Sequence, residues 1–213
     1  MNISVLPVGA LQTNCYIIAT DCKNAIVVDP GANADGIIEF LSREGLTLRY
    51  LVYTHGHYDH VGATTRLKEV TGAKTVLPKE DLDLFLNPSL AGAGIFTSHR
   101  GYVPERADIL YEEGNCIELD DVRLTAMRAP GHTKGSCILI GEGVIFTGDV
   151  LFAGSCGRTD LYGGSEAEMT ASLRRIAALE GDYQLLPGHG PQTTLSTEKI
   201  TNPYLGTNYD DIF

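Results

Sequence analysis

The feature that most constrains this chain is the hexapeptide His55-Gly56-His57-Tyr58-Asp59-His60, which places three imidazoles and one carboxylate within six positions. Directly before it, the stretch Leu48–Thr54, with Leu51 and Val52 at its centre, has the length and composition of a β-strand. Polar side chains that follow a strand lie at the end of a sheet, where groups from several strands can converge on one cleft. The sequence therefore predicts a layered α/β fold with a functional site at a sheet edge.

Three more candidate ligands follow strand-like runs later in the chain. His132 and His189 each come after a Pro-Gly pair, and Asp149 follows Phe146-Thr147-Gly148. Imidazole and carboxylate ligands without thiolates suit a borderline metal, and zinc is expected ahead of iron or manganese. Five histidines and two aspartates exceed what one four-coordinate ion can use, so two divalent metal ions are predicted, with Asp149 able to bridge them. The seven predicted ligands are His55, His57, Asp59, His60, His132, Asp149 and His189.

Two other candidate side chains, Asp29 and His99, are interpreted differently. Asp29 begins Asp29-Pro30-Gly31, which has the composition of an ordinary turn, so it is not counted as a ligand and a supporting role is left open. His99 lies in Asn87–Ala107, a stretch that carries proline and glycine without periodicity and is predicted to be a long loop. We interpret His99 as a residue of that loop.

Hydrophobic periodicity predicts two β-rich passes, each followed by helices, on either side of the long loop. Helices are predicted from an Asn33 cap to Gly45, over Val61–Val70 and Glu80–Leu86, from the capping box Ser165-Glu166-Ala167-Glu168, and over Ser196–Thr201. Strands are predicted at Ile3–Val8, Cys15–Thr20, Ala25–Asp29, Leu48–Thr54, Thr75–Leu77, Cys116–Leu119, Val122–Arg128, Cys137–Ile140, Val144–Thr147 and Tyr183–Leu186. Because no charged or low-complexity linker interrupts this pattern, residues 1–213 are expected to form a single domain.

Charge and composition exclude several classes of function. The 213 residues carry 16 basic and 27 acidic side chains, a formal net charge of −11, which disfavours binding to nucleic acid. The five cysteines are scattered and form no Cys-x-x-Cys pair, so neither a disulfide framework nor a thiolate zinc site is expected. The first residues lack a secretory-signal pattern and no apolar run has membrane-spanning length, so a cytoplasmic protein without a membrane partner is expected.

Taken together, Thr54–His60, Pro130-Gly131-His132, Gly148-Asp149 and Gly188-His189 resemble the signature of the metallo-β-lactamase superfamily. The resemblance spans nearly the whole chain and is greatest for short, single-domain members of the glyoxalase II-like (hydroxyacylglutathione hydrolase-like) group, which share a stretch similar to Gly154–Asp160. It implies an αββα sandwich with the metal site at one edge of the two sheets. Position by position, it implies a first metal at His55, His57 and His132, a second at Asp59, His60 and His189, and Asp149 between them.

The resemblance also implies an activity, the hydrolysis of a small-molecule thioester of the S-lactoylglutathione type by a metal-bridging hydroxide, with Asp59 and Asp149 as catalytic ligands. Metal coordination lowers the pKa of bound water from about 15.7 toward ~7, and a leaving thiolate with a reference pKa of about 8.5 departs without a general acid. Arg158 and Tyr162 are the predicted substrate-binding residues, since arginine can grip a carboxylate through two hydrogen bonds. The alternative, in which Arg158 pairs with Asp160 or Glu166, is equally open.

Other activities are kept as alternatives. The same superfamily contains mononuclear iron dioxygenases that act on persulfides, and His55, His132 and Asp149 would suffice for that chemistry. A β-lactam hydrolase is ranked lower because its nitrogen leaving group needs a proton, and a ribonuclease Z-like activity is weakened by the acidic charge. A non-catalytic binding module is ranked last, because such ligand sets usually leave a coordination position open for chemistry. Glyoxalase II proper continues into a helical glutathione-binding domain, which this chain is expected to lack.

Overall fold

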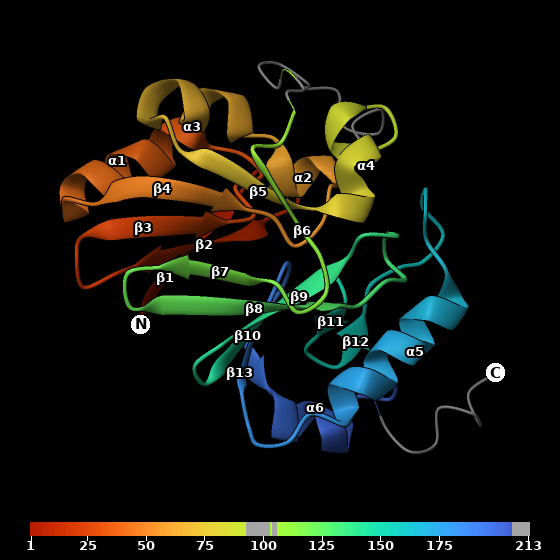
Figure 1. Ribbon diagram of the computed structural model, residues 1–213. Helices are drawn as coiled ribbons and strands as arrows, with labels where there is room; N and C mark the ends of the chain where they lie inside the picture. The colour runs from red at the N-terminus through yellow and green to blue at the C-terminus, as the bar shows by residue number, and fades with distance from the viewer. Residues whose placement is uncertain (93–102, 104–105, 206–213) are drawn as a thin grey trace.

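Two six-stranded β-sheets pack face to face in the computed structural model, which describes residues 1–92, 103 and 106–205, and helices cover both outer faces (Figure 1). The αββα sandwich implied by the family resemblance is confirmed. His99 and most of the predicted loop at 87–107 lie outside the described residues. Across the part of the chain that is described, no helix combines the length and the apolar character needed to cross a bilayer.

The first sheet has the strand order β1-β2-β3-β4-β5-β6. The strands β1 to β3 are antiparallel neighbours, whereas β3 to β6 run parallel. The parallel run brings the carboxyl ends of β3 and β4 to one edge of the sheet. The strands are β1 (Asn2–Val8), β2 (Thr13–Ala19), β3 (Asn24–Val28), β4 (Thr47–Val52), β5 (Lys74–Pro78) and β6 (Ile109–Tyr111).

The second sheet has the order β14-β13-β10-β9-β8-β7, and a small hairpin of β11 and β12 stands beside it. The strands β10 and β13 are parallel, so their carboxyl ends also meet at one edge, while the other neighbours are antiparallel. The strands are β7 (Cys116–Leu119), β8 (Val122–Arg128), β9 (Cys137–Gly141), β10 (Val144–Gly148), β11 (Leu151–Phe152), β12 (Ser155–Cys156), β13 (Gln184–Pro187) and β14 (Thr193–Thr194).

Helices form the two outer layers of the sandwich. In Figure 1, α1 and α3 lie over the first sheet, and α5 and α6 lie over the second. The helices are α1 (Ala34–Glu44), α2 (Tyr58–Val61), α3 (Thr64–Thr71), the 3₁₀ turn η1 (Lys79–Asp81), α4 (Leu82–Leu86), α5 (Glu166–Ala177) and α6 (Leu195–Thr201).

The core has three layers because alternate side chains of a strand point to opposite faces of its sheet. In β3, Ala25 and Val27 pack against the helical layer, whereas Ile26 and Val28 pack between the two sheets. In β10, Phe146 faces the other sheet and Ile145 faces the layer containing α5. Both faces of each central strand are buried, which explains their nearly continuous apolar sequence.

The structure departs from the sequence-based prediction at several short elements. The strands β6, β11, β12 and β14 were not predicted, because two or three residues carry too little periodicity to be recognised. The helix predicted over Val61–Val70 corresponds to α3, which begins only at Thr64, while Val61 is the last residue of the separate helix α2. The reason is tertiary: the backbone N–H of Ala63 donates to the carbonyl of Pro30, 2.9 Å away, instead of continuing the helical ladder.

The two predicted helix caps are realised only in part. Asn33 does precede α1, but it adopts a left-handed φ of 56° and its side chain makes no capping hydrogen bond. The Ser165 side chain does accept a hydrogen bond from the backbone N–H of Glu168, at the start of α5. The backbone N–H of Ser165 donates to Gly131 rather than to the Glu168 side chain, so the second half of the capping box is absent.

Candidate metal centre

The candidate ligands converge because the strands that precede them end at the same side of the sandwich. His55 follows β4 by three residues, and Asp149 and His189 follow β10 and β13. His132 enters from the loop after β8, in the same sheet as β10. All seven residues predicted as ligands are brought together, and they form overlapping groups whose nitrogen and oxygen atoms lie within 4.8 Å of one another.

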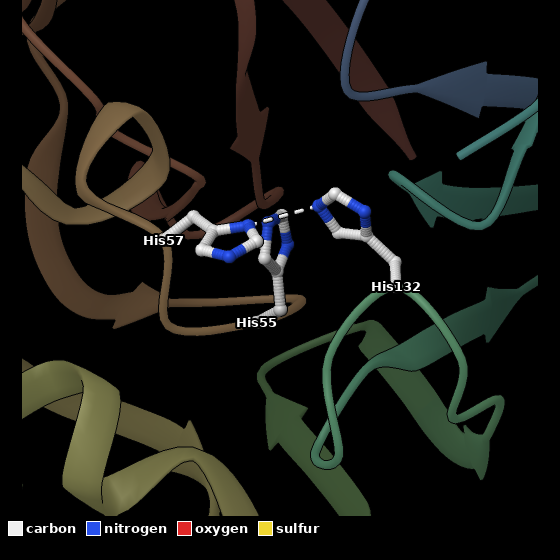
Figure 2. A group of neighbouring side chains, drawn as sticks. All are labelled: His55, His57 and His132. Carbon is white, nitrogen blue, oxygen red and sulfur yellow. Dashed lines mark hydrogen bonds between the residues drawn. The ribbon is translucent and has the colours of Figure 1, made fainter. Parts of the chain in front are cut away.

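His55, His57 and His132 form the first of these groups, which we call the three-histidine group. The ring centroids of His132 lie 4.9 Å from His55 and 4.6 Å from His57. His57 Nδ1 is 2.8 Å from His132 Nε2. Figure 2 shows that His55 and His57 come from one loop while His132 approaches from a separate loop, so two segments must meet to complete the group.

Asp59, His60 and His189 form the second group, which we call the aspartate group. His189 Nε2 lies 3.2 Å from Asp59 Oδ2, and His60 Nε2 lies 3.5 Å from the same oxygen. Asp59 and His60 are presented by the short helix α2, whereas His189 comes from the loop after β13. His60 is fully buried, while 26% of the His189 side chain is exposed at the rim.

Asp149 lies between the two groups. Its Oδ1 atom is 3.3 Å from His60 Nε2, and its Oδ2 atom is 3.5 Å from His132 Nε2 and 3.4 Å from His189 Nε2. Its position depends on Gly188, because a Cβ there would lie only 2.1 Å from Asp149 Oδ1. One carboxylate thus faces imidazoles of both groups.

Two members of the three-histidine group, His55 and His57, disfavour protonation. Burial and the neighbouring imidazoles lower the pKa of His55 well below its usual range. Burial, His132 and His60 lower the pKa of His57 to about 3. Neutral imidazoles offer the lone pairs that a metal ion requires, so this group is ready to bind a cation at neutral pH.

The aspartate group favours positive charge instead. Burial alone would lower the pKa of His60, but the charges of Asp59, Asp149 and Asp29 raise it well above its usual range. Partial burial opposes protonation of His189 too, yet its hydrogen bonds to Asp149 and Asp59 raise the pKa to about 9. The negative charge of the carboxylates therefore requires positive charge nearby. Protonated histidines supply that charge in the metal-free chain, and a metal ion would supply it when bound.

The buried polar atoms of this centre fit metal ions. Among the described residues, His55 Nε2 and His57 Nε2 are buried without a hydrogen-bond partner, and both histidines belong to the cluster. Such orphaned groups are rare in folded proteins because leaving one unpaired costs roughly 1–3 kcal/mol. A divalent cation would satisfy them, and the donor set of imidazoles and carboxylates suits zinc, iron or manganese.

Asp29 corrects one interpretation of the sequence. The turn composition is the favoured sequence interpretation, with a supporting role left open, and the structure supports the second. The Asp29 carboxylate is buried, accepts hydrogen bonds from the backbone N–H and the hydroxyl of Thr54, and lies 3.0 Å from His60 Nδ1. A carboxylate behind an imidazole orients the ring and makes it a stronger ligand. Its position directly after β3, parallel to β4, is the signal that could have revealed it.

The loop that carries His189 is held by β2, which the sequence did not indicate. Asn14 Nδ2 donates to the carbonyls of Pro187 and Gly190, at 3.0 and 2.9 Å, and the Tyr16 hydroxyl donates to Pro187 at 2.7 Å. Because every residue has a backbone carbonyl, the sequence does not indicate which carbonyls Asn14 and Tyr16 bind, and only the structure identifies them. These hydrogen bonds hold the backbone on both sides of His189 in place.

A cavity of about 470 Å³ opens over the ligands. Its polar members are mostly ligand residues and its apolar walls include Leu11, Phe152 and Leu161. Arg158 lines this cavity, but 60% of its side chain is exposed and its guanidinium forms two hydrogen bonds to Asp160, at 2.6 and 2.7 Å. The structure therefore favours the alternative in which Arg158 pairs with Asp160.

Tyr162, the second predicted substrate-binding residue, is placed elsewhere. It lines a neighbouring cavity rather than the one over the ligands. Its hydroxyl donates to Asp83 Oδ2, 2.9 Å away. Although Tyr162 lies only four positions after Arg158, its side chain does not line the cavity over the candidate ligands.

Several known proteins are similar to this chain in sequence and in fold. The family model described as the metallo-beta-lactamase superfamily matches residues 8–189. Hydroxyacylglutathione hydrolase GloC of Haemophilus influenzae is 38% identical, with 97% of this chain and 99% of the relative covered. Two solved structures are also similar: BLEG-1 B3 metallo-beta-lactamase (34% identity, 96% and 99% of the two chains, TM-score 0.89) and TTHA1623 in a di-iron-bound form (32%, 95% and 100%, TM-score 0.82).

One of these relatives is a hydroxyacylglutathione hydrolase, one is a B3 metallo-beta-lactamase and one is a protein with di-iron bound. The histidine and aspartate cluster of this chain fits the metal-dependent family that its sequence matches. By its sequence, its sandwich fold and its metal-binding cluster, the chain belongs to the metallo-β-lactamase superfamily of metallo-hydrolases.

Proposed function

We propose that this chain is a binuclear, glyoxalase II-like thioesterase acting on a small-molecule thioester. The observation that carries the proposal is the position of Asp149, whose two oxygens lie 3.3 Å from His60 Nε2 and 3.5 Å from His132 Nε2. A carboxylate facing both groups suits the two closely spaced metals of a binuclear hydrolase. The similarity to hydroxyacylglutathione hydrolase over nearly the full length of both chains supports a thioester as substrate.

In this proposal the three-histidine group holds one metal, the aspartate group holds the other, and Asp149 is shared. Two divalent metals, when bound, lower the pKa of water and polarise a carbonyl, and zinc is favoured ahead of iron or manganese. Asp59 and Asp149 keep the centre anionic, since histidine partners outweigh burial and lower the pKa of Asp59 to about 2 and that of Asp149 well below its usual range. Leu11, Phe152 and Leu161 would contact the uncharged part of the substrate.

The leaving group decides between a thioester and a lactam. A thiolate, with a reference pKa of about 8.5, departs without a dedicated acid, whereas the nitrogen of a lactam must be protonated. The residues best placed to give a proton here, His60 and His189, are proposed ligands and would release their protons to solvent when a metal binds. β-Lactam hydrolysis is therefore ranked below thioester hydrolysis, although a B3 metallo-beta-lactamase is among the similar structures.

The second candidate is a mononuclear iron persulfide dioxygenase using His55, His132 and Asp149. The assembled aspartate group argues against it, because Asp59, His60 and His189 converge within 4.8 Å although one iron would not need them. The di-iron-bound similar structure also favours two metals over one. A single iron that resists replacement by zinc would restore this candidate.

The deciding experiment combines metal analysis with a substrate panel, on protein purified without chelator and without air. We expect near two equivalents of metal per chain and turnover of S-lactoylglutathione well above that of a chromogenic β-lactam. About one equivalent of iron, together with oxygen consumption on glutathione persulfide, would overturn the thioesterase proposal in favour of the dioxygenase.

Recognition of the thiol moiety is tested by Arg158→Ala, assayed with an anionic and a neutral thioester. Because Asp160 already neutralises the guanidinium, we expect the KM for the two substrates to change by a similar, small factor. A rise confined to the anionic thioester would instead restore Arg158 as the carboxylate-binding residue predicted from the sequence.

A further inference from the structure

The two loops that supply the three-histidine group are joined by a carboxylate outside the ligand set. Asp81, at the end of η1, has an exposed fraction of 0%. Its Oδ2 atom accepts hydrogen bonds from the backbone N–H of Gly56, at 2.8 Å, and from the hydroxyl of Thr133, at 2.7 Å. Its Oδ1 atom accepts a third from the backbone N–H of Gly135, at 2.7 Å.

These contacts have a direct relation to the ligands. Gly56 stands between His55 and His57, and Thr133 immediately follows His132. One side chain thus holds both segments whose meeting creates the three-histidine group. Within the described residues, Asp81 contacts neither a ligand side chain of the aspartate group nor Asp149 through a hydrogen bond or ion pair.

The fit around Asp81 leaves no room for side chains at two of its partners. A Cβ on Gly135 would lie 2.5 Å from Asp81 Oδ1, and a Cβ on Gly56 would lie 3.0 Å from the Asp81 carbonyl oxygen and 2.8 Å from Leu84 Cβ. The backbone of Gly135 must therefore lie close to the Asp81 carboxylate, and the backbone of Gly56 must lie close to the Asp81 carbonyl group and to Leu84. Glycine is the residue type that permits such close approach.

Burying the Asp81 carboxylate costs desolvation free energy, which its hydrogen bonds must offset. Desolvation raises its pKa, against the effect of its three hydrogen bonds, and none of the ion pairs among the described residues gives it a basic partner. A buried carboxylate that lacks a cation is stabilised only when donors satisfy it. Here the three donors belong to the two ligand loops. The hydrogen bonds that stabilise the buried carboxylate therefore also hold the two loops together.

We propose that Asp81 is a positioning residue that sets the distance between the His55–His57 pair and His132, and thereby the metal affinity of the three-histidine group. It would touch neither metal nor substrate. The inference rests on the proposed ligand assignment for the metals and not on the identity of the substrate. It predicts a selective effect, on one metal of the two.

The chain offers a matched control in Glu198 of α6. This carboxylate is 2% exposed and also accepts three hydrogen bonds, from Gly154, Thr193 and Asn202, at 2.7, 2.7 and 2.8 Å. None of these partners adjoins a proposed ligand. Asp81→Asn and Glu198→Gln therefore remove comparable buried charge, but only the first loosens the ligand loops.

The test is a titration of the metal-free full-length variants with Zn²⁺ against a competing chelator, with unfolding by urea measured in parallel. We expect Asp81→Asn to weaken one of the two zinc equivalents by about 10–100-fold, as loss of an outer hydrogen-bond partner does, and to leave the other unchanged. Glu198→Gln should lose stability without weakening either equivalent. Wild-type zinc affinities in Asp81→Asn, or equal weakening of both equivalents, would overturn the proposal.

Thr133→Val keeps the test valid if Asp81→Asn does not fold. It removes one of the three hydrogen bonds to Asp81 while preserving the buried volume. A smaller weakening of the same zinc equivalent is expected, and no weakening would contradict the inference. Because zinc binding is read directly, absence of thioester turnover in the wild type would refute the proposed function without affecting this result.

Discussion

In the three-histidine group, burial and neighbouring imidazoles lower the pKa of His55 and His57, whereas in the aspartate group carboxylates raise the pKa of His60 and His189. The two groups lie side by side and share Asp149, so the contrast does not come from depth alone. It comes from the number of carboxylates: Asp29 and Asp59 both face His60. One group therefore offers neutral lone pairs, and the other offers negative charge that requires a cation.

The largest expected effect is at the shared residue. Replacing Asp149 by Ala removes the carboxylate that faces both groups and should abolish turnover, a loss larger than the ~10–100-fold typical of an outer partner. Measurement of kcat and of metal content checks this, with Asp149→Asn as a variant of similar volume. Near wild-type turnover in Asp149→Ala would falsify the shared role.

The two groups can be separated by removing one histidine from each. His132→Ala should leave about one metal equivalent, held by the aspartate group, and His189→Ala should leave about one held by the three-histidine group. Metal analysis after dialysis, followed by Co²⁺ absorption, would distinguish the two remaining sites. Loss of both metals in either variant would mean that the groups do not bind independently.

A more moderate effect is expected behind the aspartate group. Asp29→Asn removes the charge 3.0 Å from His60 Nδ1 while keeping the size of the side chain. We expect metal affinity or kcat to fall by about 10–100-fold, because the imidazole loses its orienting carboxylate. The fold of the variant should persist, which circular dichroism and urea unfolding can verify. An unchanged kcat and zinc affinity would return Asp29 to a purely structural role.

The smallest effect is the pH dependence of stability in the metal-free protein, where the two groups should act on opposite sides of neutrality. His57, with a folded pKa of about 3 against about 6.5 when unfolded, binds fewer protons when folded, so it removes stability as the pH falls from 6.5 toward 3. His189, with a folded pKa of about 9, contributes stability that is present below pH 6.5 and is lost as the pH rises toward 9.

Urea unfolding of metal-free protein from pH 4 to pH 9 measures both slopes. His57→Gln should flatten the acid side of the profile, and His189→Gln should flatten the alkaline side. If each variant changed the same side, the electrostatic contrast between the two groups would be wrong.

Much of the candidate site could be anticipated because ligand type and strand ends are local properties. The motif at His55–His60 and the residues after β8, β10 and β13 were identified from composition and position alone. The sequence leaves a supporting role for Asp29 open because Asp-Pro-Gly has the composition of an ordinary turn, and it does not indicate Asp81 because nothing in its neighbourhood marks it. Their partners lie 25 to 54 residues away along the chain, so only folding brings them together.

The amino-acid sequence by itself determined most of the strand and helix positions, and the candidate ligand types placed after the strands, because both depend on short-range patterns. The tertiary structure alone decided which ligands share a group, that Arg158 pairs with Asp160, and that Tyr162 points into a neighbouring cavity. It also decided that Asp29 contacts His60 and that Asp81 joins the loops of the three-histidine group. Those outcomes depend on contacts between distant segments, whose geometry is set by how the sheets pack and not by any local pattern.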